Sequence, residues 1–176
     1  MIRQSVGVAC AALVFAAGNA WADNGGNSGP ASQFSASLSG FNEVPLAIFS
    51  QGNGKLELSI DEGGGSLNYT LSYSGLTSPV TQAHIHFGQR HVAGGIMMFF
   101  CSNLGNGPAG TQACPEGEGT VSGTIMANQV VGPEPQNIQP GDFAALVKAI
   151  RSGTGYANVH TTKFPSGEIR GQVHRQ

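Results

Sequence analysis

The sequence predicts an all-β domain, an antiparallel Greek-key β-sandwich or barrel with one short packed α-helix. Short runs in which apolar and polar residues alternate recur along the chain, and this period of two is that of half-buried strands. Turn residues separate the runs, because the 176 residues include 27 glycines and 9 prolines. Many short strands with frequent turn signals are typical of sandwiches and barrels. Hydrophobic residues make up 40% of the chain, which is enough for a packed core.

The N-terminus has the features of an export signal. Arg3 supplies a positive charge, residues 6–17 form a short apolar run, and Ala20-Trp21-Ala22 matches the A-x-A cleavage pattern. We therefore expect a signal peptide over residues 1–22, with cleavage between Ala22 and Asp23. The mature protein is then expected to be periplasmic or secreted.

The rest of the chain reads as a linker followed by one domain. Residues 23–32 are polar and rich in glycine, which predicts a flexible linker, and the domain is expected over residues 33–176. The apolar run of the signal is too short for a transmembrane helix, and no later segment approaches the required length. We therefore expect no integral membrane segment.

Alternating patterns and turn signals place the strands of this domain in order along the chain. The expected strands are 34–38, 56–60, 67–73, 80–87, 96–100, 119–126, 156–161 and 168–173. The second and third strands should form a hairpin, because the turn sequence DEGGGS joins them. The fifth strand is apolar on both faces, so it is expected in the interior of the assembly.

One segment, about 142–152, has the pattern of a helix. Asp142 is a suitable N-cap, and Gly153 supplies the stop. The apolar positions follow helical spacing and form one stripe: Phe143, Leu146, Val147 and Ile150. A helix of this length is not stable alone, so it is expected to pack on the sheet.

Two cysteines remain once the signal peptide, with Cys10, is removed. An even number of cysteines in an exported protein indicates a disulfide, here between Cys101 and Cys114. The alternative is a pair of thiolate metal ligands, for which the chain lacks the C-x-x-C spacing.

Histidines form the sharpest candidate site. His84 and His86 share one face of an expected strand, roughly 6.6 Å apart along the chain. Two imidazoles at this spacing can bind one metal ion. His160, on another expected strand, would complete three ligands if the two strands are neighbours, and His91 and His174 are further candidate ligands.

Neutral imidazoles suit both copper and zinc, and the order of affinities favours Cu(II) over Zn²⁺. Metal binding is expected to weaken as the pH falls through the histidine range, because protonated imidazole cannot ligate. The same histidines are also explained without a metal, as solvated or hydrogen-bonded side chains on a strand.

The remaining patterns point to no catalytic chemistry. Glu168 and Arg170 read as a surface ion pair of little energetic weight. The chain contains no G-x-S-x-G, no H-E-x-x-H and no phosphate-binding loop, so no catalytic residue is assigned. A net charge of −2 offers no basic patch for nucleic acid, and we expect no nucleic-acid partner.

Four motifs in order resemble those of the CHRD domain, the domain named after chordin that also occurs alone in bacterial exported proteins. They cover most of the chain and are LSGFNEVP at 38–45, AHIHFG at 83–88, NVHT at 158–161 and FPSGEIRGQ at 164–172. The resemblance implies a secreted or periplasmic β-rich module, and chordin suggests that another extracytoplasmic protein is its partner.

A looser similarity concerns the histidines alone. The run HIHFG is similar to the strand of Cu/Zn superoxide dismutases that supplies two copper ligands, and NVH is similar to a later strand that supplies another. By this likeness His84, His86 and His160 fall on copper-ligand positions. The zinc-loop histidines and the arginine that guides superoxide are missing.

Three functional hypotheses follow. The first is an exported binding module that holds copper or zinc on these three histidines. The second is a metal-free domain that binds a protein or matrix polymer through its loops. The third, which the missing zinc site disfavours, is a dismutase-like enzyme.

Overall fold

Nine antiparallel strands form one sheet that curls into a nearly closed barrel in the computed structural model, which describes Met1 and residues 33–176. The strands are β1 (Gln33–Ser39), β2 (Asn53–Asp61), β3 (Ser66–Ser74), β4 (Val80–Phe87), β5 (Gly95–Ser102), β6 (Gly119–Met126), β7 (Gly155–Thr161), β8 (Ile169–Gln172) and β9 (His174–Arg175). The order across the sheet is β5-β4-β7-β8-β1-β2-β3-β6, and β9 pairs with β1. The predicted fold class is confirmed.

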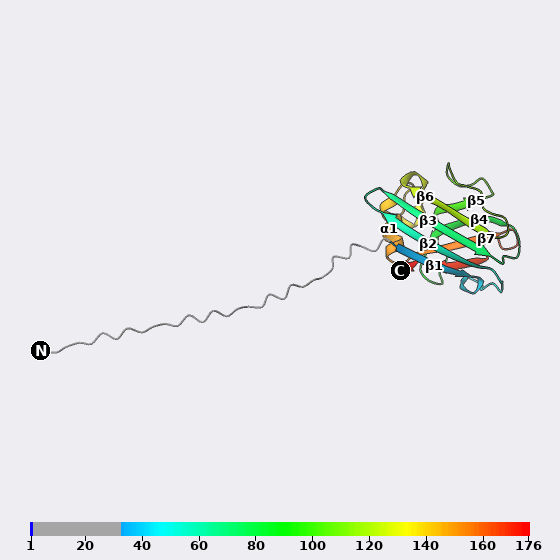
Figure 1. The fold of residues 1–176 in the computed structure, drawn as a ribbon, viewed down its shortest axis with the longest axis horizontal. Helices are drawn as coiled ribbons and strands as arrows, with labels where there is room; N and C mark the ends of the chain where they lie inside the picture. Colours follow the sequence, from blue (N-terminus) through cyan, green and yellow to red (C-terminus); the bar gives the residue numbers. More distant parts are fainter. Residues whose placement is uncertain (2–32) are drawn as a thin grey trace.

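The two ends of this path, β5 and β6, lie close together. In Figure 1 the strands β1, β2, β3 and β6 form one layer, and β4, β5 and β7 form a second layer behind it. The pairs β3–β6, β4–β7 and β8–β1 join strands that are not consecutive in the chain, as in Greek-key connections.

The core fills the space between the layers with alternate side chains of each strand. The pattern is clear in β1, where Phe34, Ala36 and Leu38 are buried and point inward. Strand β5 is buried along almost its whole length, as its apolar sequence predicts. Every residue of β7 is buried, which means that both faces of this strand are covered.

The helix α1 (Phe143–Arg151) begins after Asp142, whose carboxylate accepts a hydrogen bond from the backbone N–H of Ala145 at 2.9 Å. Its apolar stripe packs into the core through Leu146 and Ile150, both fully buried. The predicted helix is therefore confirmed. Three short 3-10 helices, Gly40–Asn42, Ala127–Gln129 and Glu134–Gln136, complete the elements.

The predicted signal peptide (1–22) and linker (23–32) lie outside the described residues, apart from Met1. In the part of the chain that the structure describes, no helix combines the length and the apolar character needed to cross a membrane.

The end of the chain differs from the expected single strand over 168–173. Strand β8 ends at Gln172, and Val173 turns inward, with its N–H donating to the carbonyl of Gly155 at 2.9 Å. The chain then continues as β9 against β1.

The predicted surface ion pair of Glu168 and Arg170 is wrong, because both side chains are buried, at 0% and 3% exposure. The Glu168 carboxyl group accepts hydrogen bonds from Ser50, Thr77 and Thr161. Sequence spacing placed Glu168 on an exposed strand face, whereas it lies just before β8 and is covered by two loops.

The predicted disulfide is present and joins Cys101 to Cys114 across 13 positions. We expect replacement of both cysteines by alanine to lower the free energy of unfolding by about 3 kcal/mol, because a loop of this size becomes free in the unfolded chain. Urea unfolding of the oxidised protein and the variant measures the difference. Identical unfolding curves would contradict the prediction.

Candidate metal centre

Three histidines meet on the outer face of the barrel, where β4 and β7 pair. His84 and His86 occupy alternate positions of β4, and His160 lies on β7. The antiparallel register places Gln82 opposite His160 and His84 opposite Asn158, so the three imidazoles project on the same side. The intervening residues, such as Ile85 and Val159, point into the core. The two strands are thus neighbours, as the three-ligand hypothesis requires.

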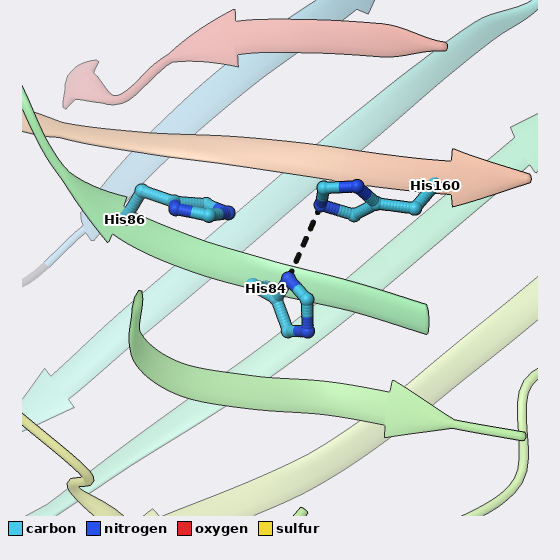
Figure 2. A group of neighbouring side chains, drawn as sticks. All are labelled: His84, His86 and His160. Carbon is cyan, nitrogen blue, oxygen red and sulfur yellow. Dashed lines mark hydrogen bonds between the residues drawn. The ribbon is translucent and has the colours of Figure 1, made fainter. Parts of the chain in front are cut away.

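The rings converge on one point. Figure 2 shows His86 and His160 pointing toward each other along the strands, with His84 between them. One ligand atom from each histidine lies within 4.8 Å of the others. Nδ1 of His84 donates a hydrogen bond to Nε2 of His160, and the two atoms are 3.2 Å apart. Two nitrogens bound tetrahedrally to one ion with bonds of about 2.0 Å are about 3.3 Å apart, so this pair already has a ligating separation.

Hydrogen bonds to loop carbonyls fix the orientation of two of the rings. Nδ1 of His86 donates to the carbonyl of Gly94 at 2.9 Å. Nδ1 of His160 donates to the carbonyl of Pro165 at 3.0 Å. Because each Nδ1 carries the proton, the Nε2 atom of each ring is unprotonated. The Nε2 lone pair of His86 is free, and that of His160 accepts from Nδ1 of His84. This is the arrangement by which outer partners orient metal-binding histidines.

Glycine is required where the first of these carbonyls approaches β4. A Cβ atom on Gly94 would lie 1.7 Å from the backbone oxygen of Phe87, so no other residue fits without moving the chain. The close approach brings the Gly94 carbonyl within reach of His86.

Two buried nitrogens of the cluster have no hydrogen-bond partner among the described residues, Nε2 of His84 and Nε2 of His86. A buried polar atom without a partner is costly, and such atoms are rare in native proteins. An ion bound between the rings would give the Nε2 atom of His86 a partner.

Side chains and loops cover the cluster, so that His84, His86 and His160 are only 0%, 8% and 6% exposed. The ring of Phe99 on β5 packs edge-on against the His84 ring, with ring centroids 4.4 Å apart. The loops 88–94 and 162–168 contribute the carbonyls of Gly94 and Pro165. The cluster therefore lies in a second buried layer outside the barrel wall.

Burial keeps the imidazoles neutral. It lowers the pKa of His84 to about 2, with the neighbouring imidazoles of His160 and His86 adding to the effect. Burial also lowers the pKa of His86 to about 4 and that of His160 below its usual value. Acid is therefore expected to protonate these imidazoles at a lower pH than it protonates free histidine.

Glu43 lies in the same buried layer, and burial favours the uncharged form of its carboxyl group by raising the pKa. Its Oε1 atom accepts a hydrogen bond from Nδ2 of Asn158 at 2.5 Å, and burial raises the pKa of this carboxyl group to about 7. A Cβ atom on Gly167, at φ +129°, would lie 2.7 Å from the same oxygen, so glycine leaves room for the carboxyl group.

We expect the stability of the metal-free protein to fall as the pH decreases from 6.5 toward 5. In this range the unfolded chain protonates the three histidines, whereas the folded chain keeps His84 and His86 neutral and protonates His160 less readily. The unfolded state therefore binds more protons. Glu43 opposes this trend, because below pH 7 the folded state holds its proton. His84 and His86 alone outweigh one carboxyl group, His160 adds to them, and each net proton contributes about 1.4 kcal/mol per pH unit.

Urea unfolding in the presence of a chelator, at pH 7.5, 6.5 and about 5.5, checks this prediction. Stability that stays constant or rises toward acid would contradict it.

A stack of three side chains leads away from the cluster. The Tyr156 ring lies parallel to the His86 ring, with centroids 4.9 Å apart and an angle of 5°. The guanidinium of Arg170 lies 3.5 Å from the centroid of the same Tyr156 ring. His86 and Arg170 belong to β4 and β8, the strands on either side of β7.

The other two candidate ligands lie outside the three-histidine group. His91 is exposed in the loop after β4, with a left-handed φ of 63°. His174 is exposed on β9, opposite Ser35. In residues 33–176 no second group of three metal-ligating side chains occurs.

Sequence reasoning missed the partners that orient the rings. The carbonyls of Gly94 and Pro165 carry no residue-type signature, so no motif could have revealed them. Tyr156 was identifiable in part, because it shares the strand face of His160. The packing of Phe99 against His84 follows from the pairing of β4 with β5, which sequence reasoning did not predict.

Together the fold and this cluster define an antiparallel β-barrel module with three convergent histidines on its outer face. The CHRD domain model matches residues 34–173. Because the match spans most of the chain, the protein belongs to the CHRD domain family, and the resemblance stated from the four motifs is confirmed. No curated protein and no solved structure matches the chain.

Proposed function

We propose that this protein is an exported binding module that holds one copper or zinc ion on His84, His86 and His160. The observation that carries the proposal is the convergence of three buried, neutral imidazoles whose ligand atoms lie within 4.8 Å of one another. Hydrogen bonds to Gly94 and Pro165 support it, because they direct the Nε2 lone pairs of two rings inward.

The donor set favours copper over zinc. Imidazole nitrogens suit both ions, and for a given nitrogen site the affinity for Cu²⁺ exceeds that for Zn²⁺. Three protein ligands leave a position open for a further ligand. The cluster itself includes no carboxylate or thiolate, which makes a hard cation such as Mg²⁺ a poor fit.

The experiment is a metal analysis of the protein purified from the periplasm without a histidine tag, paired with Cu(II) and Zn(II) titrations. We expect close to one ion per chain, and none in the His84→Ala/His86→Ala/His160→Ala variant. Equal binding by both proteins would overturn the proposal in favour of a metal-free interaction domain.

Export is tested separately. The disulfide and the family support an extracytoplasmic location, and another extracytoplasmic protein is the partner we expect. N-terminal sequencing of the periplasmic or secreted protein should begin at Asp23. Retention of the full chain in the cytoplasm would contradict this part of the proposal.

A further inference from the structure

A cavity of about 660 Å³ lies beside Arg170, apart from the histidine cluster. Its walls come from six segments: β1, the first 3-10 helix, the loop after β4, the turn after α1, β8 and β9. None of the three clustered histidines lines it. The volume falls within the range of small-molecule sites.

The lining of this cavity is cationic. Arg90 and Arg170 contribute two guanidinium groups, and His91, His174 and Asn42 add nitrogen donors. No aspartate or glutamate of residues 33–176 lines it. The buried Glu43 carboxyl group, whose pKa burial raises to about 7, does interact electrostatically with Arg170. In a chain whose net charge is −2, the concentration of donors along the cavity wall is nevertheless a local feature that attracts anions.

Arg170 is held in place before any ligand arrives. Its side chain is 3% exposed, and its Nη2 atom donates to the carbonyls of Gln89 and Val92 at 3.1 and 2.9 Å. The Tyr156 ring supports the guanidinium plane from one side. A fixed guanidinium loses little conformational freedom on binding.

Part of the guanidinium has no partner within the protein. A guanidinium carries five N–H donors, two of them on Nη2. In the described part of the chain, Nε and Nη1 of Arg170 donate to no residue. These donors lie on different edges of the guanidinium, so Nε and Nη1 can each donate separately to an oxygen of a carboxylate or phosphate.

The loop that carries Arg90 and His91 is also set in an unusual conformation. His91 has a φ of 63°, a region that residues other than glycine seldom occupy and that is enriched at ligand sites. The carbonyls of Gln89 and Val92, which accept hydrogen bonds from Arg170, lie on either side of His91 in the chain. The conformation of the loop therefore determines where the buried guanidinium lies.

We propose that this cavity binds a small molecule through a carboxylate or phosphate head group, with the guanidinium of Arg170 as the main contact and Arg90 as the second cation. The proposal goes beyond metal binding and does not depend on it, since the two sites share no lining residue.

The test is calorimetric titration of the metal-free protein with inorganic phosphate and, separately, with succinate, at constant ionic strength. We expect saturable binding of one of the two anions at one site per chain, and the tighter anion identifies the head group. Arg170→Lys keeps the charge but loses the Nε and Nη1 donors, and should weaken binding by about tenfold or more. Arg90→Gln, at an exposed position, should weaken it several-fold.

Lys148→Gln is the matched control, because it removes one exposed positive charge from α1, away from the cavity. It should leave binding unchanged. Absence of saturable binding by either anion would overturn the proposal. A Lys148→Gln variant that loses as much binding as Arg90→Gln would overturn it too, since the effect would then be general charge attraction.

Discussion

His86→Ala should lower the affinity of the protein for Cu(II) by about 100-fold or more. Changes to groups that only orient metal ligands typically lower the metal affinity by about 10–100-fold. Loss of a direct ligand should lower the affinity further. His86 is the informative position because its Nδ1 is occupied by the Gly94 carbonyl, while its Nε2 is buried without a partner. Competition titration against a chelator of known affinity measures the change.

His174→Ala is the matched control, since His174 is exposed on β9 and lies outside the cluster. It should bind Cu(II) as the unmodified protein does. If the two variants bind equally well, His86 is not a ligand. If both lose binding equally, surface histidines account for the copper bound.

Glu168→Ala should lower the free energy of unfolding by about 3 kcal/mol or more. Its carboxyl oxygens accept four hydrogen bonds, from Ser50 Oγ, Thr77 N, Thr77 Oγ1 and Thr161 Oγ1, at 2.6 to 3.0 Å. Alanine would leave these buried donors without a partner and create a cavity, and the two costs add.

Two further variants separate this explanation from a general effect of charge. Glu168→Gln should lose less stability than Glu168→Ala, because the amide oxygen can still accept from Thr77 N while the amide nitrogen donates to threonine hydroxyls. Glu118→Ala, at an exposed position, should change stability by less than about 0.5 kcal/mol. Chemical denaturation of all three variants is the measurement, and an unchanged Glu168→Ala protein would contradict the prediction.

The sequence was sufficient for the elements that have a strong local pattern. Strands β4 and β6 have the predicted bounds, because alternation and flanking turn residues define both ends of each. The helix is likewise marked by its cap at Asp142 and its apolar stripe. At the C-terminus the pattern was misleading, since Glu168 and Arg170 alternate with apolar residues and yet are buried by loops.

The sequence alone predicted only part of the candidate site. The H-x-H spacing places His84 and His86 on one face, because a strand has a period of two. His160 is more than 70 positions away, and its arrival beside them depends on the pairing of β4 with β7. That pairing is a property of the whole sheet, as are the loop conformations that bring the Gly94 and Pro165 carbonyls to the rings.

The position of the cluster outside the barrel wall has a consequence for exchange kinetics. An ion held there is separated from solvent by loops and by Phe99, whereas the strands beneath it keep their own packing in the interior. Local opening of surface loops requires less free energy than global unfolding. If the proposed ion binds there, its uptake and release would require only local opening of these loops, while the barrel stays folded.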